Sequence, residues 1–361
     1  MKNPSAYIYE IHYLRAVACL FVLLVHVSAA FSNQQGRFND FTFFINQISR
    51  FGTPLFAVIS GFLLFYQVRK KGFNIKKFLS SRVTKIGMPF MFWSIFYLLF
   101  MFVMEDVNPF LIGENEFLIN FAAGESFYHL YFMSLVFQFY LIFLVLQLFR
   151  SKISWFLLLI LSILANVYFL TGFDPTHFKG LWQFALSKRA FLPNWIFFFV
   201  FGGFLAYYWE GLYSFSRKYR KALAIMSIIV TILAVYEYKA VGSIPSNRVS
   251  NIINIPLLTL FIIGMGDKIN QVNWLKKTLT KIGTLSMAIY LVHPLVLYLI
   301  QEIAPPVIWQ TRFFPVVFLI ILGTTIAVVN LIQLFPKNEY ILTLPKIKNR
   351  NSTKEEVRAI A

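Results

Sequence analysis

The sequence contains a single cysteine, Cys19, in 361 residues. One thiol excludes an intramolecular disulfide and a metal site built from several cysteines. We interpret Cys19 as a small residue packed between helices, and a thiol that carries an acyl group is the alternative. Charged residues are also scarce, since they make up 13% of the chain, whereas 58% of it is hydrophobic. One soluble core could not bury so much apolar surface, so we predict an integral membrane protein.

Acidic residues are fewer than half as numerous as basic ones, 15 against 33, which gives a net charge of +18. Such a surplus can indicate a nucleic-acid partner. Here, however, the basic residues form short clusters between long apolar runs, an arrangement that is typical of multi-pass membrane proteins. We therefore expect membrane lipids, and no nucleic acid, as partners, and we predict no metal site.

Ten apolar segments are each close to the roughly 20 residues that a hydrocarbon core requires. We predict an all-α polytopic membrane protein with about ten transmembrane helices in a domain of residues 1–336. The basic tail that follows, 337–361, is expected to be disordered. The first segment could be a signal peptide, but it is long enough to span and a second follows closely, so we expect it to be retained. The segments are 11–31, 43–67, 86–104, 128–149, 153–171, 191–209, 222–238, 250–265, 282–300 and 313–335.

The distribution of lysine and arginine predicts the orientation. With ten spans and both termini in the cytoplasm, 24 of the 33 basic residues lie on the cytoplasmic side, seven lie outside, and Arg15 and Arg50 fall within spans. Every cytoplasmic loop is then basic, as the positive-inside rule requires. Pro256 interrupts the short eighth segment. We keep that segment because dropping it would move earlier basic loops to the outside.

Arg15 and His26 are unusual residues for the first apolar segment. Eleven helical steps turn by about 1100°, three turns plus about 20°, so both side chains lie on one face, roughly 16 Å apart along the axis. Charged and titratable groups are costly in hydrocarbon, and they usually mark a functional site. A histidine can take up and return a proton near neutral pH, so His26 is a candidate general base.

Two further histidines, His129 and His293, fall in or at the ends of apolar segments. Each could take part in catalysis, or could form a hydrogen bond that holds helices together. Tyr290 lies three residues before His293 and Ser286 seven before it, so the three share one helical face. Tyr290 could orient His293 or donate to an oxyanion, and the alternative is an interhelical hydrogen bond.

Arg82 and Lys85 lie three residues apart at the start of the third segment, on one helical face. Together with Arg15 they would form an anion site for a phosphorylated cytoplasmic ligand, although charges at this depth can also be solvated. Ser60 and Gly61, in the second segment, most often indicate close helix packing. Gly61 could instead let a substrate chain pass.

Five stretches in this order, LRAVACLFVLLVH, RFGTPLFAVISGFLLF, FLSSRVTKIGMPF, YHLYFM and SMAIYLVHPLVL, resemble the membrane-bound acyltransferase type 3 family. The resemblance is to the bacterial branch that includes surface-polysaccharide O-acyltransferases and the intercellular-adhesion polysaccharide proteins. Arg15 and His26 match the family's signature positions, and Arg82 matches the first arginine of its paired-arginine motif. Lys85 replaces the usual second arginine, which keeps the charge but removes bidentate phosphate recognition. Tyr131 replaces a usual tryptophan.

The resemblance implies a multi-pass enzyme of the bacterial cytoplasmic membrane that transfers an acyl group, acetyl above all, from cytoplasmic acyl-CoA to a cell-envelope sugar. Acyl-CoA would be a co-substrate, with no bound cofactor. Its phosphates would lie at the three basic residues, and its thioester near His26, which would act as base or acyl relay. His293 or Tyr290 could stabilise the oxyanion. The alternatives are a polysaccharide exporter or flippase, and a scaffold subunit of a glycan synthase.

Overall fold

The computed structural model describes residues 8–242 and 244–343, and within them the secondary structure is entirely helical. The α-helices are α1 (Tyr9–Gln35), α2 (Asp40–Ser49), α3 (Gly52–Lys71), α4 (Ile75–Arg82), α5 (Met88–Glu105), α6 (Glu114–Ala122), α7 (Tyr131–Leu146), α8 (Lys152–Thr171), α9 (Gly180–Leu186), α10 (Ile196–Tyr207), α11 (Trp209–Lys218), α12 (Arg220–Val241), α13 (Asn251–Gly264), α14 (Gly266–Gln271), α15 (Asn273–Ile303) and α16 (Phe314–Gln333). A π-helix, η1 (Val83–Gly87), joins α4 to α5. Short 3₁₀ turns are η2 (Pro109–Ile112), η3 (Pro175–His177), η4 (Leu192–Asn194), η5 (Pro306–Trp309), η6 (Thr311–Phe313) and η7 (Asn338–Tyr340).

Each of the ten predicted segments corresponds to a helix or a helix pair in the described part of the chain. Eight are long and apolar enough to cross a membrane, namely α1, α2 with α3, α4 with α5, α8, α12, α13 with α14, α15 and α16. The pair α10 and α11 would be a ninth, although it bends by 91°, and α7 is a shorter apolar helix of 16 residues. The all-α, multi-pass fold is therefore confirmed.

The exposed faces of the outer helices are apolar, as lipid contact requires. Large apolar side chains are strongly exposed there. The accessible fraction of the surface is 54% for Leu157 on α8, 49% for Ile232 on α12 and 63% for Leu319 on α16. In water such surfaces would associate, whereas in a bilayer they need no partner. The protein is thus a multi-pass membrane protein.

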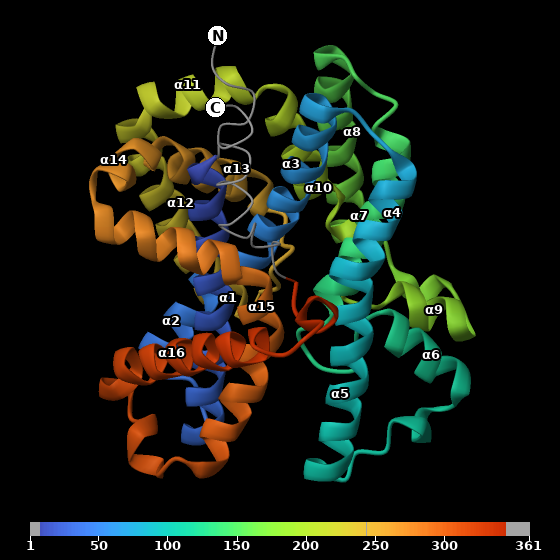
Figure 1. Cartoon of the computed structure of the whole chain (residues 1–361), viewed down its shortest axis with the longest axis vertical. Coiled ribbons are helices and arrows are strands. Elements are labelled where there is room, and N and C mark those ends of the chain that lie inside the picture. The colour runs from blue at the N-terminus through green and yellow to red at the C-terminus, as the bar shows by residue number, and fades with distance from the viewer. Residues whose placement is uncertain (1–7, 243, 344–361) are drawn as a thin grey trace, which may run out of the picture.

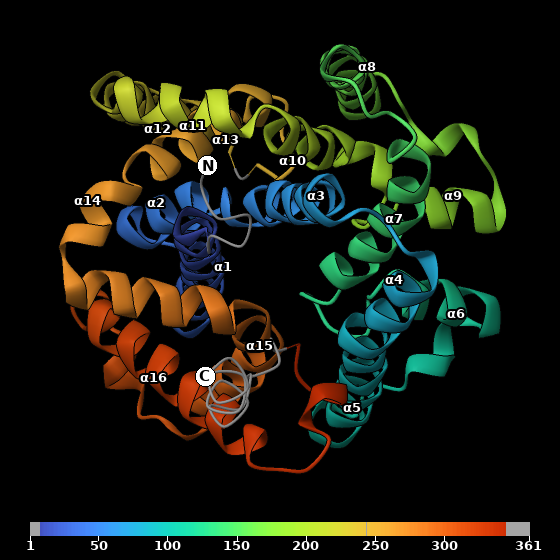
Figure 2. The same cartoon turned by 45° about the horizontal axis from the view of Figure 1, so that its top comes forward.

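Helix α1 lies at the centre of the bundle. It packs most extensively against α15, and also against α2 and α3, while α3 packs closely against α10. Figure 2, which views α1 almost end-on, places α2 and α3 on one side of it and α15 on the other. The four-residue connection from α1 to α2 turns at Gly36, whose φ of 75° suits glycine, and α2 begins at the capping box of Asn39 and Thr42.

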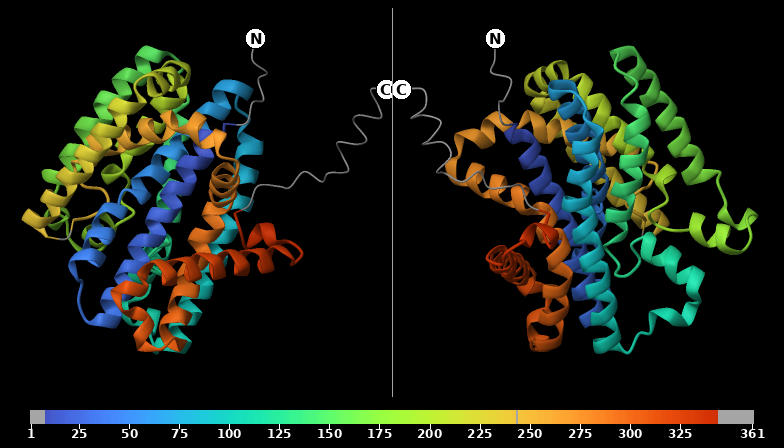
Figure 3. Two further views of the ribbon diagram at one scale, coloured as in Figure 1. Left: turned by 90° about the vertical axis from the view of Figure 1, so that its left-hand side faces the viewer. Right: turned by 45° about the vertical axis from the view of Figure 1, so that its right-hand side comes forward.

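Several segments differ from continuous, upright spans. The second predicted segment is two helices, and the break between α2 and α3 places Arg50 at its corner. The third begins earlier than expected, because α4 and η1 extend α5 back to Ile75. Helix α16 runs across the long axis of the molecule, as both Figure 1 and Figure 3 show.

The start of the predicted tail packs against the bundle. Leu342 is buried, the backbone oxygen of Ile341 accepts from Trp93 Nε1 at 2.9 Å, and Thr343 Oγ1 donates to the backbone oxygen of Lys85 at 2.7 Å. Residues 344–361, the rest of the predicted disordered tail, lie outside the described residues. The side of the membrane on which each terminus lies remains a prediction.

Gly61 allows α3 and α10 to approach each other. A Cβ at Gly61 would lie 2.1 Å from the backbone oxygen of Phe199, and a Cβ at Gly202 would lie 2.1 Å from that of Val58. Real Cβ atoms do not come that close, so each helix needs a glycine opposite the backbone of the other. Gly61 lines none of the cavities described below, which fits the packing interpretation.

Gly61→Ala is expected to destabilise the protein by about 1–3 kcal/mol, since the added methyl group would force α3 and α10 apart. The matched control is Gly323→Ala in α16, where a Cβ meets nothing within 4 Å. Alanine there should be neutral or stabilising by up to about 1 kcal/mol. Thermal unfolding of the detergent-solubilised protein, followed by size-exclusion chromatography, would compare the two. Equal stability of both variants would contradict the packing role.

Candidate functional site

Two cavities enter the bundle from opposite ends of α3. The first, which we call the basic cavity, has a volume of about 620 Å³. Its polar and charged lining residues are Arg15, Ser60, Tyr66, Gln67, Lys70, Lys71, Arg82, Lys85, Tyr140 and Thr343. The second, the histidine cavity, has a volume of about 570 Å³. Its polar and charged lining residues include His26, Asn46, Arg50, Thr53, Tyr128, His129, Tyr131, Lys188, Arg189, Asn194 and Tyr290.

Three histidines from distant parts of the sequence meet beside the histidine cavity. The ring centroid of His26, on α1, lies 5.2 Å from that of His293, on α15. The ring of His129, which precedes α7, lies 5.8 Å from that of His293. His129 and His293 are buried, whereas His26 is partly exposed to the cavity. Of the three, His26 is therefore the histidine best placed to meet a ligand that enters this cavity.

The hydrogen bonds of His293 determine its tautomer. Nδ1 lies 3.0 Å from the backbone oxygen of Ile289, which can only accept, so Nδ1 carries the proton. Nε2 is buried and makes no hydrogen bond. In the neutral ring this Nε2 is an acceptor, and it cannot donate to an oxyanion. The predicted oxyanion role would require a protonated His293.

Tyr290 has a structural hydrogen bond. Its hydroxyl donates to the backbone oxygen of His129, and this bond joins α15 to the segment before α7. The donor is thus engaged, so the geometry favours the interhelical alternative over donation to an oxyanion. His129 itself has both ring nitrogens buried without a hydrogen bond. Its ring lies across the ring of Tyr97, with centroids 5.2 Å apart.

The three basic residues predicted to bind phosphate line one cavity. Arg15 Nε donates to Ser286 Oγ at 3.2 Å, which turns its side chain toward α15. The guanidinium of Arg82 lies 5.2 Å from the ring centroids of both Phe78 and Tyr140, and Nη1 donates to Tyr140 Oη at 3.4 Å. No acidic residue lines this cavity in the described part of the chain. The arrangement therefore favours an anionic ligand.

Helix η1 brings Lys85 to the same cavity as Arg82. A π-helix adds one residue to a turn and often occurs at functional sites. The sequence-based prediction assumed ordinary α-helical spacing, yet both side chains still line the basic cavity. Ser60 also lines it, and its hydroxyl donates to the backbone oxygen of Phe56 at 2.9 Å.

The two cavities are separated by a thin layer of packed side chains. Phe132 lines both of them. A small void between them has no room for a water molecule and is bounded by Cys19, Phe56, Tyr290 and His293, among others. Cys19 is buried, and its thiol contacts the backbone oxygen of Ser286 at 3.8 Å. This fits its interpretation as a residue packed between helices.

The structure adds cationic residues that the sequence-based prediction missed. Arg50, Lys188 and Arg189 line the histidine cavity. Arg189 Nε lies 3.6 Å from a Glu125 oxygen, and Lys188 Nζ donates to Asn120 Oδ1 at 2.5 Å. Burial lowers the pKa of Lys188, and the Glu125 carboxylate partly offsets this. The sequence did contain an indication that Arg50 belongs to the site, because an arginine within an apolar segment is as unusual as Arg15 is in the first one.

Tyr128 was also missed. It lines the histidine cavity, and its ring centroid lies 4.8 Å from that of His26. The sequence indicated a role for Tyr128 through its position immediately before His129 in the stretch YHLYFM. In the described residues, no group of three or more His, Cys, Asp or Glu side chains is arranged to hold a metal ion.

The fold and these cavities define a multi-pass membrane protein with a histidine cluster between two openings. A family model described as an acyltransferase domain matches residues 8–332. The chain belongs to this acyltransferase family, and it is a membrane-bound acyltransferase, which confirms the resemblance seen in the sequence. No solved structure matches the chain significantly.

The curated relatives carry a different kind of name. A protein of Staphylococcus aureus (strain MRSA252) is 26% identical over 306 residues, which cover 80% of this chain and 82% of the relative. A protein of Staphylococcus epidermidis is 27% identical over 300 residues, which cover 80% and 81%. Each is named "Probable poly-beta-1,6-N-acetyl-D-glucosamine export protein". These relatives agree with a place in the bacterial cytoplasmic membrane and with a connection to polysaccharide.

Proposed function

We propose that the protein transfers an acyl group, acetyl above all, from acyl-CoA in the basic cavity to a hydroxyl of a cell-envelope glycan in the histidine cavity. The observation that carries this proposal is the arrangement of the two cavities, which reach the same layer of side chains from opposite ends of α3. A donor and an acceptor that approach from the two sides of a membrane need such a meeting point.

The basic cavity suits the donor. Coenzyme A carries phosphates, and Arg15, Arg82 and Lys85 supply three cations with no acidic residue among the described lining residues. Basic loops are cytoplasmic by the positive-inside rule, so we place this cavity on the cytoplasmic side. The spacing of Arg15 and His26 along α1, roughly 16 Å, would let the pantetheine arm extend from the phosphates toward the histidines.

In the proposed reaction, His26 accepts the proton of the sugar hydroxyl as its oxygen attacks the thioester carbonyl. The new C–O bond forms, the C–S bond breaks, and the thiolate of coenzyme A leaves and takes up the proton from His26. The neighbouring His293, neutral with its proton on Nδ1, adds no second positive charge beside the protonated His26 ring 5.2 Å away. An acyl relay through His26 is the alternative.

Tyr128 is the side chain that we propose as a donor to the oxyanion. It lies beside His26 in the histidine cavity, whereas the hydroxyl of Tyr290 is engaged by the His129 carbonyl. A neutral donor positioned where negative charge develops would lower the barrier of the acyl-transfer step.

Export is the second candidate function, because the relatives are named as export proteins. An exporter must pass a whole sugar chain, whereas the packed side chains between the two cavities, among them Phe132 and Tyr290, would have to open widely for one. An acyl thioester on its pantetheine arm needs a much narrower passage. The packing therefore favours acyl transfer over export.

The two functions predict different results when the protein is removed from its host. Acyl transfer predicts that the glycan still reaches the cell surface, but that its ester-linked acyl groups, measured by mass spectrometry before and after mild alkali, are lost. Export predicts that polymer accumulates inside the cell with an unchanged acyl content. Complementation with the full chain should restore the acyl groups. Normal acylation in its absence would overturn the proposal.

A further inference from the structure

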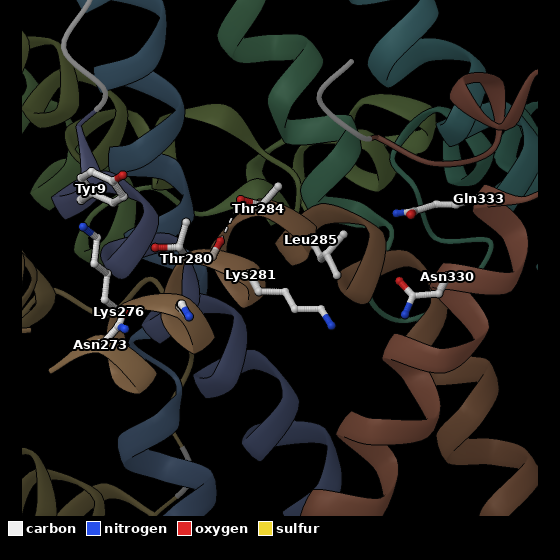
Figure 4. Close-up of a pocket in the computed structure, with 10 residues that line it drawn as sticks. Tyr9, Asn273, Lys276, Thr280, Lys281, Thr284, Leu285, Asn330 and Gln333 are labelled. Atoms are coloured by element: carbon white, nitrogen blue, oxygen red, sulfur yellow. Dashed lines mark hydrogen bonds between the residues drawn. The ribbon is translucent and has the colours of Figure 1, made fainter. Parts of the chain in front are cut away.

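A third cavity lies apart from the two that we assign to the reaction. It has a volume of about 600 Å³ and is formed by the first turns of α15 and the end of α16. We call it the lysine pocket, because Lys276, Lys277 and Lys281 line it (Figure 4). It shares no lining residue with the basic cavity or the histidine cavity. A role in binding donor or acceptor at those two cavities therefore does not account for it.

The lysine pocket is strongly positive. Its three lysines lie within one and a half turns of α15, and no acidic side chain lines the pocket in the described part of the chain. Lys276 Nζ lies 4.3 Å from the ring centroid of Tyr9, on the neighbouring α1. Like charges that line one cavity repel one another, and a bound anion would relieve that repulsion.

Helix α16 contributes two amides to the opposite wall. Asn330 and Gln333 are the two amide side chains of a largely apolar helix, and they lie three residues apart, hence on one face. Figure 4 shows Lys281 on α15 and Asn330 on α16 extending toward one another across the pocket. A polar group on a membrane helix requires a partner. The amides of this wall, of which Asn330 lies across from Lys281, can donate to, and accept from, a polar ligand held between the two helices.

Exposed apolar side chains, which we call the rim, neighbour the lining residues of the lysine pocket along the chain. Trp274, three residues before Lys277 on α15, has 69% of its surface exposed. Leu334, which directly follows the last residue of α16, has 81% of its surface exposed, and Phe335 next to it has 63%. Tryptophan prefers the boundary between lipid headgroups and chains, and lysine extends its ammonium to the headgroups. A soluble anion would gain nothing from such a rim, whereas a lipid would use it.

We propose that the lysine pocket binds the headgroup of an anionic phospholipid. The phosphate would lie among Lys276, Lys277 and Lys281, the polar headgroup atoms would bond to Asn330 and Gln333, and the acyl chains would lie along Leu334 and Phe335. Because α15 also carries Tyr290 and His293, this lipid would hold the cationic end of the helix that contributes to the histidine cluster. The proposal does not depend on which reaction the protein catalyses.

Delipidated full-length protein, reconstituted into nanodiscs of phosphatidylcholine with a minor fraction of phosphatidylglycerol, provides the test. Native mass spectrometry of the protein after its release from the nanodiscs would count the phosphatidylglycerol molecules that stay bound to it. We compare the wild type with the triple variant K276Q/K277Q/K281Q and with the control K218Q/K221Q/K268Q, which removes three exposed lysines outside the pocket. Three headgroup contacts predict a drop in phosphatidylglycerol affinity of about a hundredfold for the pocket variant and little change for the control.

Two results would overturn the proposal. Equal loss in both variants would mean that lipid retention follows overall charge and not this pocket. Displacement of the retained lipid by millimolar glycerol phosphate or inorganic phosphate would mean that the site recognises a soluble phosphate and makes no use of the acyl chains. Thermal stability of each variant in detergent, measured in parallel, would identify a variant that fails to fold, and N330L/Q333L would then test the opposite wall instead.

Discussion

Replacing His26 by alanine or glutamine is expected to lower kcat for acyl transfer by about 10²- to 10⁴-fold, the range that a positioned general base contributes. Of the three clustered histidines, His26 is the one partly exposed to the histidine cavity, whereas His129 and His293 are buried, so His26 is the best placed to meet a sugar hydroxyl. Transfer of labelled acyl groups from acyl-CoA to glycan by the purified, reconstituted protein would measure the loss.

The matched control for His26 is His177→Gln. His177 lies in η3, exposed and outside both cavities, so its substitution should leave kcat unchanged. Elution volume and thermal unfolding of the H26A and H26Q variants should match those of the wild type, because the His26 side chain borders a cavity and makes no hydrogen bond within the described part of the chain whose loss would weaken the bundle. Ordinary activity in H26Q would remove His26 from the mechanism and direct attention to Tyr128.

Loss of the arginines in the basic cavity is expected to weaken binding of acyl-CoA. A hydrogen bond to a charged group contributes about 1.5–3 kcal/mol, so Arg82→Gln or Arg15→Gln should raise KM for acyl-CoA about 10- to 100-fold. The effect on kcat should be smaller, because neither side chain lines the histidine cavity. Arg82→Lys should give an intermediate KM, since lysine keeps the charge but cannot bind phosphate through two parallel bonds.

Arg150→Gln serves as the control for these arginines. Arg150 is exposed between α7 and α8, and it lines neither the basic nor the histidine cavity. Its substitution should leave KM for acyl-CoA unchanged. A parallel rise in R150Q would show that general positive charge, and not the basic cavity, attracts the donor. An unchanged KM in R15Q and R82Q would place the donor elsewhere.

Residues within one helix were the most predictable part of the site. Arg15 and His26 share a face because α-helical geometry is the same in any helix of this length, and the apolar run left no doubt that α1 would be one. Arg82 and Lys85 were predicted on ordinary helical spacing, and they reached the same cavity through the π-helix η1. Their roles in catalysis and donor binding remain predictions until the variants above are measured.

Contacts between helices were much less predictable. The meeting of His26, His129 and His293 and the bond from the Tyr290 hydroxyl to the His129 carbonyl join residues more than 100 positions apart. Such contacts depend on crossing angles and on which small residues let helices approach, as Gly61 and Gly202 do for α3 and α10. The hydrophobic periodicity of one segment predicts neither the crossing angle of two helices nor which small residues let them approach.

The amino-acid sequence by itself determined that this is an all-α, multi-pass membrane acyltransferase with a histidine and an arginine on one face of its first helix. It could do so because hydrophobic length and helical period are local properties, and because the family motifs occur in order along the chain. Only the tertiary structure decided that His26 and Arg15 open into different cavities, that Phe132 and Tyr290 lie between them, and that α15 and α16 form a lysine pocket. Cavities are the spaces that packed helices leave unfilled, so they exist only once every helix has found its neighbours.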